Sequence, residues 1–289
     1  MLAISLGPLA LPLPPLLLLG AVLTAQWLAS RLARRPQAGD GALPDGAARR
    51  AAQAGDAFTT AALLGLLAAR GAYVTLHADA YFAAPWSVID VRDGGWHAGA
   101  GLAAGLGWLA WRAWRRPALR RALAAGATAG ALLWFGLHAA LTPARGTPMP
   151  ALEVAALDGA GRLTLPQAAQ GLPAVVVLWA SWCAPCREEM PLLAAAQARE
   201  AGLRFLFVNQ GESEATVRRY LAGLPYAVQN VLLDAASALG PAVGSPGLPT
   251  TLFYDAAGRQ VEAHFGVLNA AALESRLLTL RRGPMATAR

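Results

Sequence analysis

The sequence predicts an all-α transmembrane domain of about four helices in residues 1–147, followed by a mixed α/β domain in residues 148–289. Hydrophobic residues make up 56% of the 289 residues and charged residues only 14%, whereas soluble domains carry about 25% charge. Residues 1–147 hold 13 Arg and 6 acidic residues, and residues 148–289 hold 11 of each. The net charge of +7 therefore lies in the apolar half, which indicates membrane topology and argues against a nucleic-acid partner.

Apolar stretches separated by Arg-rich segments predict the membrane helices. They cover residues 16–32, 57–78, 94–111 and 122–144. Each is close to the ~20 residues that cross a bilayer core of ~30 Å. A cleaved signal peptide carries its positive charge before the apolar core. Here Arg31, Arg34 and Arg35 follow the first stretch, so we expect an anchor that is retained.

The distribution of Arg predicts the orientation. Segments 31–56 and 112–121 each contain five Arg, whereas segment 79–93 contains only Arg92. Arg residues collect on the cytoplasmic side of a membrane. We therefore expect a multi-pass protein of the inner (cytoplasmic) membrane, with the α/β domain facing the periplasm.

One charge, Arg70, lies inside the second apolar stretch. A charge within a span costs about 3 kcal/mol or more, so Arg70 is either a functional residue or a side chain that reaches to the interface. Residues 69–74 and 93–101 resemble two segments of prolipoprotein diacylglyceryl transferase. His97 lies two residues after Gly95, where that family has four, and a later Gly-Arg-x-Gly-Asn-Phe segment is absent. A lipid-modifying protein with an attached redox module is therefore the alternative function, and we expect His97 to cap a helix.

The second half shows the alternation of strands and helices that is typical of α/β domains. We expect a hairpin over 152–165, a buried strand over 175–179, a helix over 183–201, a strand over 204–208, a helix over 213–221, a strand over 231–233, a hairpin over 250–265 and a closing helix capped by Asn269. Glu212 and Glu214 lie near the positive end of the 213–221 helix.

The pair Cys183 and Cys186 lies where the buried strand passes into a helix. A helix N-terminus favours a thiolate, which is the nucleophile in disulfide exchange. We expect Cys183 to be the accessible attacking thiol and Cys186 the more buried resolving thiol. A zinc site needs about four ligands, and His264 is the only His in this half. A purely structural disulfide would close too small a loop to stabilise much. We expect neither a metal nor a cofactor.

Residues 179–191 resemble the TlpA/ResA family of extracytoplasmic thioredoxin-like proteins. Every defined position of the pattern Trp-Cys-x-Pro-Cys-Arg-x-Glu-x-Pro is present, and residues 247–251 match the family's cis-proline segment. The resemblance implies an α/β thioredoxin fold, disulfide reduction or exchange, and a membrane-tethered domain facing the periplasm.

The resemblance also assigns roles to Glu189 and Pro249. Glu189 follows Cys186 by three residues, on the same side of the helix, and is implied to act as acid or base beside the buried thiol. The alternative is a surface carboxylate paired with Arg187 or Arg199. Pro249 is implied to be cis, which leaves the backbone of the preceding Leu248 open to a substrate chain.

Together these features predict a membrane-anchored, periplasm-facing thiol–disulfide oxidoreductase, most simply a disulfide reductase. Its expected partners are periplasmic protein disulfides or thiols, membrane lipid, and a separate transmembrane thiol carrier as electron donor, because residues 1–147 contain no Cys. A third possibility is a binding protein that uses the fold as a docking surface, although such a protein would not need both thiols.

Overall fold

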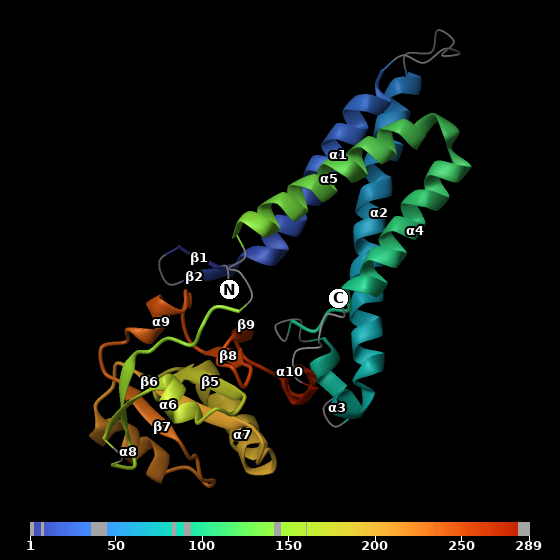
Figure 1. Cartoon of the computed structure of the whole chain (residues 1–289). Helices are drawn as coiled ribbons and strands as arrows, with labels where there is room; N and C mark the ends of the chain where they lie inside the picture. The colour runs from blue at the N-terminus through green and yellow to red at the C-terminus, as the bar shows by residue number, and fades with distance from the viewer. Residues whose placement is uncertain are drawn as a thin grey trace. The chain divides into compact units, whose positions relative to one another are not determined.

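The computed structural model describes residues 3–6, 9–35, 45–82, 85–89, 94–141, 146–159 and 161–282 (Figure 1). The chain divides into two compact units. One unit is helical and comprises Pro12–Ala78 and Gly95–Thr142. The other comprises Met1–Leu11, Asp79–Gly94 and Pro143–Arg289 and contains the α/β fold.

The long helices of the helical unit pack with the first against the last and the second against the third. They are α1 (Leu13–Ala33), α2 (Asp45–Leu76), α4 (Ala98–Arg115) and α5 (Arg120–Leu141). Helix α1 contacts α5 and α2, and α2 contacts α4 (Figure 1). A Cβ at Gly126 would lie 2.6 Å from the carbonyl oxygen of Ala25, and one at Gly101 would lie 2.9 Å from that of Gly65. Glycine thus permits the close backbone approach that is typical of membrane helices.

Three helices among the described residues are long and apolar enough to cross a membrane. They lie at Pro15–Ala33, Gly46–Leu76 and Pro117–Ala140. Apolar side chains are exposed on these helices, and Leu67 and Leu132 are both 70% exposed, as expected for surfaces that lipid covers. Helix α4 has 18 residues and carries Arg112 and Arg115 in its last turn. That α4 crosses the membrane stays a prediction from the sequence pattern.

The ends of two helices differ from the expected boundaries. Helix α2 begins at Asp45 instead of residue 57, because the intervening segment is rich in Ala, which favours a helix without being apolar enough to mark a span. Helix α1 begins at Leu13. Pro14 and Pro15 fall in its first turn, where the missing N–H has no intrahelical partner to lose. Short elements complete this part of the chain: β1 (Ala3–Leu6), β2 (Leu9–Pro12), α3 (Ala78–Phe82), η1 (Pro85–Val88) and η3 (Pro117–Leu119).

Arg70 and His97 join α2 to the start of α4. The Nη1 atom of Arg70 donates to the carbonyl oxygen of Gly95 at 3.0 Å, and the backbone N–H of His97 donates to that of Ala69 at 3.0 Å. The Nδ1 atom of His97 accepts the N–H of Ala100 at 3.0 Å, which confirms the expected helix cap. Arg70 therefore has a polar partner at the end of the helix pair.

The α/β unit is built on a seven-stranded sheet of order β4-β3-β7-β6-β5-β8-β9. The strands are β3 (Glu153–Ala156), β4 (Arg162–Thr164), β5 (Ala174–Trp179), β6 (Arg204–Gln210), β7 (Val231–Asp234), β8 (Thr250–Tyr254) and β9 (Gln260–Phe265). Strand β5 runs parallel to β6 and antiparallel to β8. The helices are α6 (Leu165–Ala169), α7 (Ala184–Arg199), α8 (Glu214–Ala222), α9 (Leu239–Ala242) and α10 (Ala270–Arg282). Each expected strand and helix of this half is present, and α6 and α9 were not expected.

Strand β5 lies at the centre of two hydrophobic cores, one on each face of the sheet. All six of its residues are buried. Val175, Val177 and Trp179 join the core that contains side chains of α7 and α10. Val176 and Leu178 join the core that contains α6 and Leu239 of α9. Because successive side chains of a strand point to opposite faces, this apolar run is held from both sides, and the end of β5 is a rigid support for the residues that follow.

Candidate active site

The cysteine pair lies at the junction predicted from the sequence. Strand β5 ends at Trp179, and Cys183 is the N-cap residue of α7. The backbone N–H of Cys186 donates to the Sγ atom of Cys183 at 3.2 Å. The two residues form a disulfide with a Cα–Cα distance of 5.3 Å. The Cys183 sulfur thus occupies a helix N-terminus, where an N–H group and the helix dipole favour its thiolate.

The two cysteines differ less in exposure than expected. Cys183 is 5% exposed and Cys186 is 1% exposed, so the order matches the prediction but both residues are buried. In the disulfide form each sulfur covers the other, which reduces the accessibility expected for Cys183. The neighbouring Trp182 is 69% exposed and offers an apolar surface beside the pair.

Glu189 is buried in α7, one turn after Cys186. Its side chain is 2% exposed, and its Oε2 atom accepts the backbone N–H of Leu268 at 2.9 Å. Its Oε1 atom is buried without a hydrogen-bond partner among the described residues. Burial raises the pKa of Glu189 to about 7, and the Leu268 hydrogen bond offsets part of this rise. The alternative of a surface carboxylate is therefore wrong.

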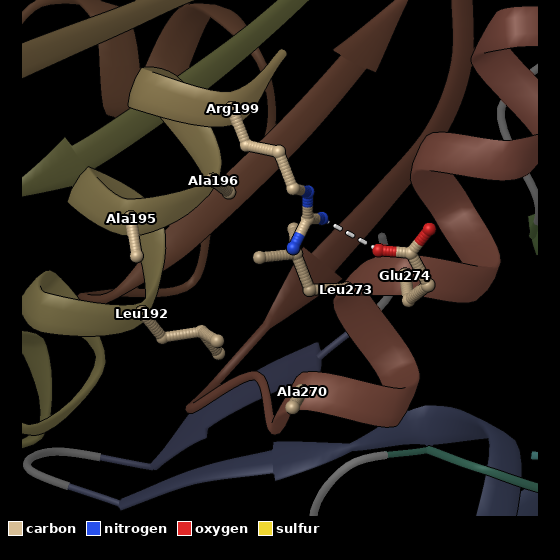
Figure 2. A pocket seen from close by; sticks show the side chains of 7 residues that line it. All are labelled: Leu192, Ala195, Ala196, Arg199, Ala270, Leu273 and Glu274. Atoms are coloured by element: carbon tan, nitrogen blue, oxygen red, sulfur yellow. Dashed lines mark hydrogen bonds and ion pairs between the residues drawn. The ribbon is translucent and has the colours of Figure 1, made fainter. Parts of the chain in front are cut away.

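Arg199, one of the partners considered for Glu189, pairs elsewhere. Its Nη2 atom lies 2.7 Å from Oε2 of Glu274, and its Nε atom lies 2.8 Å from Oε1 of Glu200. Figure 2 shows the ion pair with Glu274 at the edge of a pocket between α7 and α10, which Leu192 and Leu273 line. The pocket contains none of the predicted site residues.

Pro249 precedes β8 on the strand next to the cysteine segment. The Leu248–Pro249 bond is cis, as expected. Thr250 pairs with Leu178 in the antiparallel β5–β8 register, so the residues before β8 lie beside those that follow β5. Leu248 packs against the core that contains both cysteines. Within the described part of the chain, neither its N–H nor its C=O group has a hydrogen-bond partner.

Glu212 is a residue of this site that the sequence pattern did not identify. Its Oε2 atom accepts the backbone N–H of Ser181 at 2.7 Å and the Nδ2 group of Asn209 at 2.6 Å. Its Oε1 atom accepts the hydroxyl of Ser181 at 2.5 Å. Burial raises the pKa of Glu212, but these hydrogen bonds outweigh burial, and the net pKa lies below the ordinary value. Ser181 is 31 residues away in sequence, so no local signal marks the contact.

A family model described as Redoxin matches residues 144–282. The thiol:disulfide interchange protein DsbE of Pseudomonas fluorescens biotype C is 32% identical over 124 residues, which cover 43% of this chain and 68% of that protein. DsbE of Escherichia coli (strain K12) is 31% identical over 157 residues, 50% of this chain and 81% of that protein.

The protein HelX of Rhodobacter capsulatus, also named a thiol:disulfide interchange protein, is 30% identical over 118 residues, 41% of this chain and 66% of that protein. Among solved structures, a putative thiol:disulfide interchange protein DsbE from Chlorobium tepidum is 26% identical, with a TM-score of 0.43. The match covers 47% of this chain and 97% of that one.

Proposed function

Through its C-terminal half this chain belongs to the family of thiol:disulfide interchange proteins, and we propose that it is a membrane-anchored disulfide reductase of the TlpA/ResA type that faces the periplasm. Its α/β unit has the thioredoxin-like fold, and the protein is a thiol–disulfide oxidoreductase. The observation that carries the proposed mechanism is the position of Cys183 at the N-cap of α7, with the N–H of Cys186 directed at its sulfur.

In the proposed reaction, the Cys183 thiolate attacks a substrate disulfide and releases one substrate thiolate, which takes up a proton. The resulting mixed disulfide is attacked at the Cys183 sulfur by the thiolate of Cys186. The second substrate thiol leaves, and two electrons have passed from the cysteine pair to the substrate. Glu189 takes the proton of the Cys186 thiol, a role that its burial and its raised pKa support. The unpaired backbone of Leu248 offers hydrogen bonds to the substrate chain.

The helical unit is proposed to be an anchor in the lipid of the inner membrane. In this proposal residues 1–147 cross the bilayer four times, α4 included, and residues 148–289 face the periplasm. The Arg-rich segments that follow α1 and precede α5, with few Arg at the other ends of these helices, support this orientation. Arg70 and His97 serve the packing of α4 on α2, which favours an anchor over the lipid-modifying alternative.

Labelling of single cysteines tests the orientation. In a chain in which Cys183 and Cys186 are replaced by Ser, we introduce either Ala48→Cys, in α2, or Ala151→Cys, just before β3. An impermeant thiol reagent added to intact spheroplasts should label the second variant and leave the first unlabelled until the membrane is opened. Equal labelling of Ala48→Cys in closed spheroplasts would contradict the topology.

Trapping of substrates tests the reaction. The Cys186→Ser variant can form the mixed disulfide but cannot resolve it, so we expect periplasmic proteins to remain attached to Cys183 and to be released by a reducing agent. The matched Cys183→Ser variant should capture none above background. Capture through Cys186 instead, or no capture by either variant under conditions where the wild type is turned over, would show that the assigned roles are wrong.

A further inference from the structure

The carboxylate of Glu212 holds the turn that carries the attacking cysteine. Residues 180–183 form this turn, which is closed by a hydrogen bond of 3.2 Å from the N–H of Cys183 to the carbonyl oxygen of Ala180. Ser181, inside the turn, gives both its N–H and its hydroxyl to Glu212. Both carboxylate oxygens are therefore engaged with the segment that leads directly into Cys183.

The same carboxylate is fixed from a second strand. Asn209 donates to it from β6, and Asn209 pairs with Trp179, the last residue of β5, in the parallel register. Asn209 is fully buried, and so is its neighbour Trp179. Glu212 thus bridges the ends of two rigid adjacent strands and the turn between β5 and α7. Hydrogen bonds to an ionised carboxylate are about twice as strong as neutral ones.

The position of the Cys183 sulfur depends on this turn. The sulfur is favoured as a thiolate only while it stays at the N-terminus of α7, within reach of the Cys186 N–H. We propose that Glu212 is a positioning residue of the redox site: through Ser181 it keeps Cys183 at the helix N-terminus and thereby keeps its thiol acidic and reactive. This inference rests on the proposed role of Cys183 as the attacking thiol.

The test is the pKa of the Cys183 thiol in the reduced full-length chain in detergent, measured as the pH dependence of alkylation by iodoacetamide. In the wild type, Cys183 should react before Cys186 and titrate well below the free-thiol value of ~8.5. In Glu212→Ala, we expect the pKa of Cys183 to rise by about one unit, which slows alkylation at pH 6 about tenfold.

Three further variants separate positioning from other effects. In Glu212→Gln the amide oxygen accepts from the Ser181 N–H and from Asn209, and the amide NH₂ donates to the Ser181 hydroxyl, so the alkylation rate should stay within about twofold of the wild type. Ser181→Ala removes one of the three contacts and should shift the pKa of Cys183 in the same direction as Glu212→Ala, but less. Glu214→Ala is the matched control: Glu214, two residues after Glu212, is the first residue of α8 and pairs with Arg218 instead, so the pKa of Cys183 should not change.

An unchanged Cys183 pKa in folded Glu212→Ala would overturn the inference. A rise of the Cys183 pKa in Glu212→Gln as large as that in Glu212→Ala would overturn it too. If Glu212→Ala does not fold, Ser181→Ala decides, and an unchanged pKa there overturns the inference. Alkylation measures the Cys183 thiol without a disulfide substrate. Its result does not depend on whether the protein reduces or oxidises its substrates. Failure of the reductase proposal therefore appears as absent trapping by Cys186→Ser, and failure of the positioning role as an unaltered thiol pKa.

Discussion

In sealed vesicles that hold this protein as the only membrane protein, Cys183 and Cys186 should stay oxidised when thioredoxin and its reductase are supplied on the cytoplasmic face. Each turnover as a reductase leaves the pair as a disulfide. Residues 1–147 contain no Cys, so the helical unit has no thiol that could relay electrons across the bilayer. The proposed electron source is therefore a separate transmembrane thiol carrier.

The redox state of the pair is measured by alkylation with a reagent that adds mass, after quenching in acid. Co-reconstitution of a transmembrane thiol carrier should convert the oxidised form to the reduced form within the same assay. A small permeant dithiol serves as the positive control, because it reduces the pair without a carrier. Reduction by cytoplasmic thioredoxin in vesicles that lack any second membrane protein would show that the helical unit itself transfers electrons.

The second prediction concerns how the stability of a Glu189→Gln variant, relative to the wild type, changes with pH. The pKa of Glu189 in the folded chain is about 7, against an ordinary value of 4.5. Because the folded pKa is the higher one, the contribution of Glu189 to stability is fully present below about pH 4.5 and is lost as the pH rises through about 7. A shift of this size corresponds to about 3 kcal/mol. A Glu189→Gln variant, which does not titrate, should therefore gain up to about that much relative to the wild type between pH 4 and pH 8.

Urea unfolding of the oxidised full-length protein in detergent, followed by hydrogen exchange of the peptide that contains β5, measures this difference at each pH. The cost of placing an amide group in the buried site is the same at every pH, so it shifts the difference from wild type by a constant and leaves the pH dependence of that difference unchanged. Glu188→Gln is the matched control, because Glu188 is its exposed neighbour in α7 and should show no such trend. A pH-independent difference for Glu189→Gln would contradict the assigned pKa.

The sequence predicted the central strands and the cysteine junction because these depend on local patterns. Residues 175–179 form a continuous apolar run with Pro173 shortly before it and Ser181 shortly after it, and the pair Cys183 and Cys186 follows where a helical pattern begins. The spacing from Cys186 gave the side of α7 on which Glu189 lies, but the hydrogen-bond partner of its carboxylate was not predictable from a local pattern. That partner is the N–H of Leu268, 79 residues later, which approaches α7 only in the folded chain.

The two short helices that the sequence analysis did not predict, α6 and α9, differ in how clearly the sequence marks them. Helix α6 has a capping box between Thr164 and Gln167, with Pro166 near its start, and this pattern was present in the sequence. Helix α9 spans only Leu239–Ala242 and includes Gly240 and Pro241, so no periodicity could mark it. The contacts of Glu212 with Ser181 and Asn209 depend on β5 and β6 being neighbours, which is a property of the tertiary structure.

The packing of α1 on α5 means that a helix made early in synthesis must wait for a partner made much later. Helix α1 meets α5 where Gly126 and Gly130 leave room for the backbone at Ala25 and Ala21. These partners are about 100 residues apart, so at ordinary translation rates the ribosome needs roughly 5–20 s to supply the second helix after the first. Until then the small-residue face of α1 has only α2 as a partner from its own chain. Because α5 (Arg120–Leu141) is made after α2 and α4, the contacts of α1 with α5 can form only after the other long helices have been made.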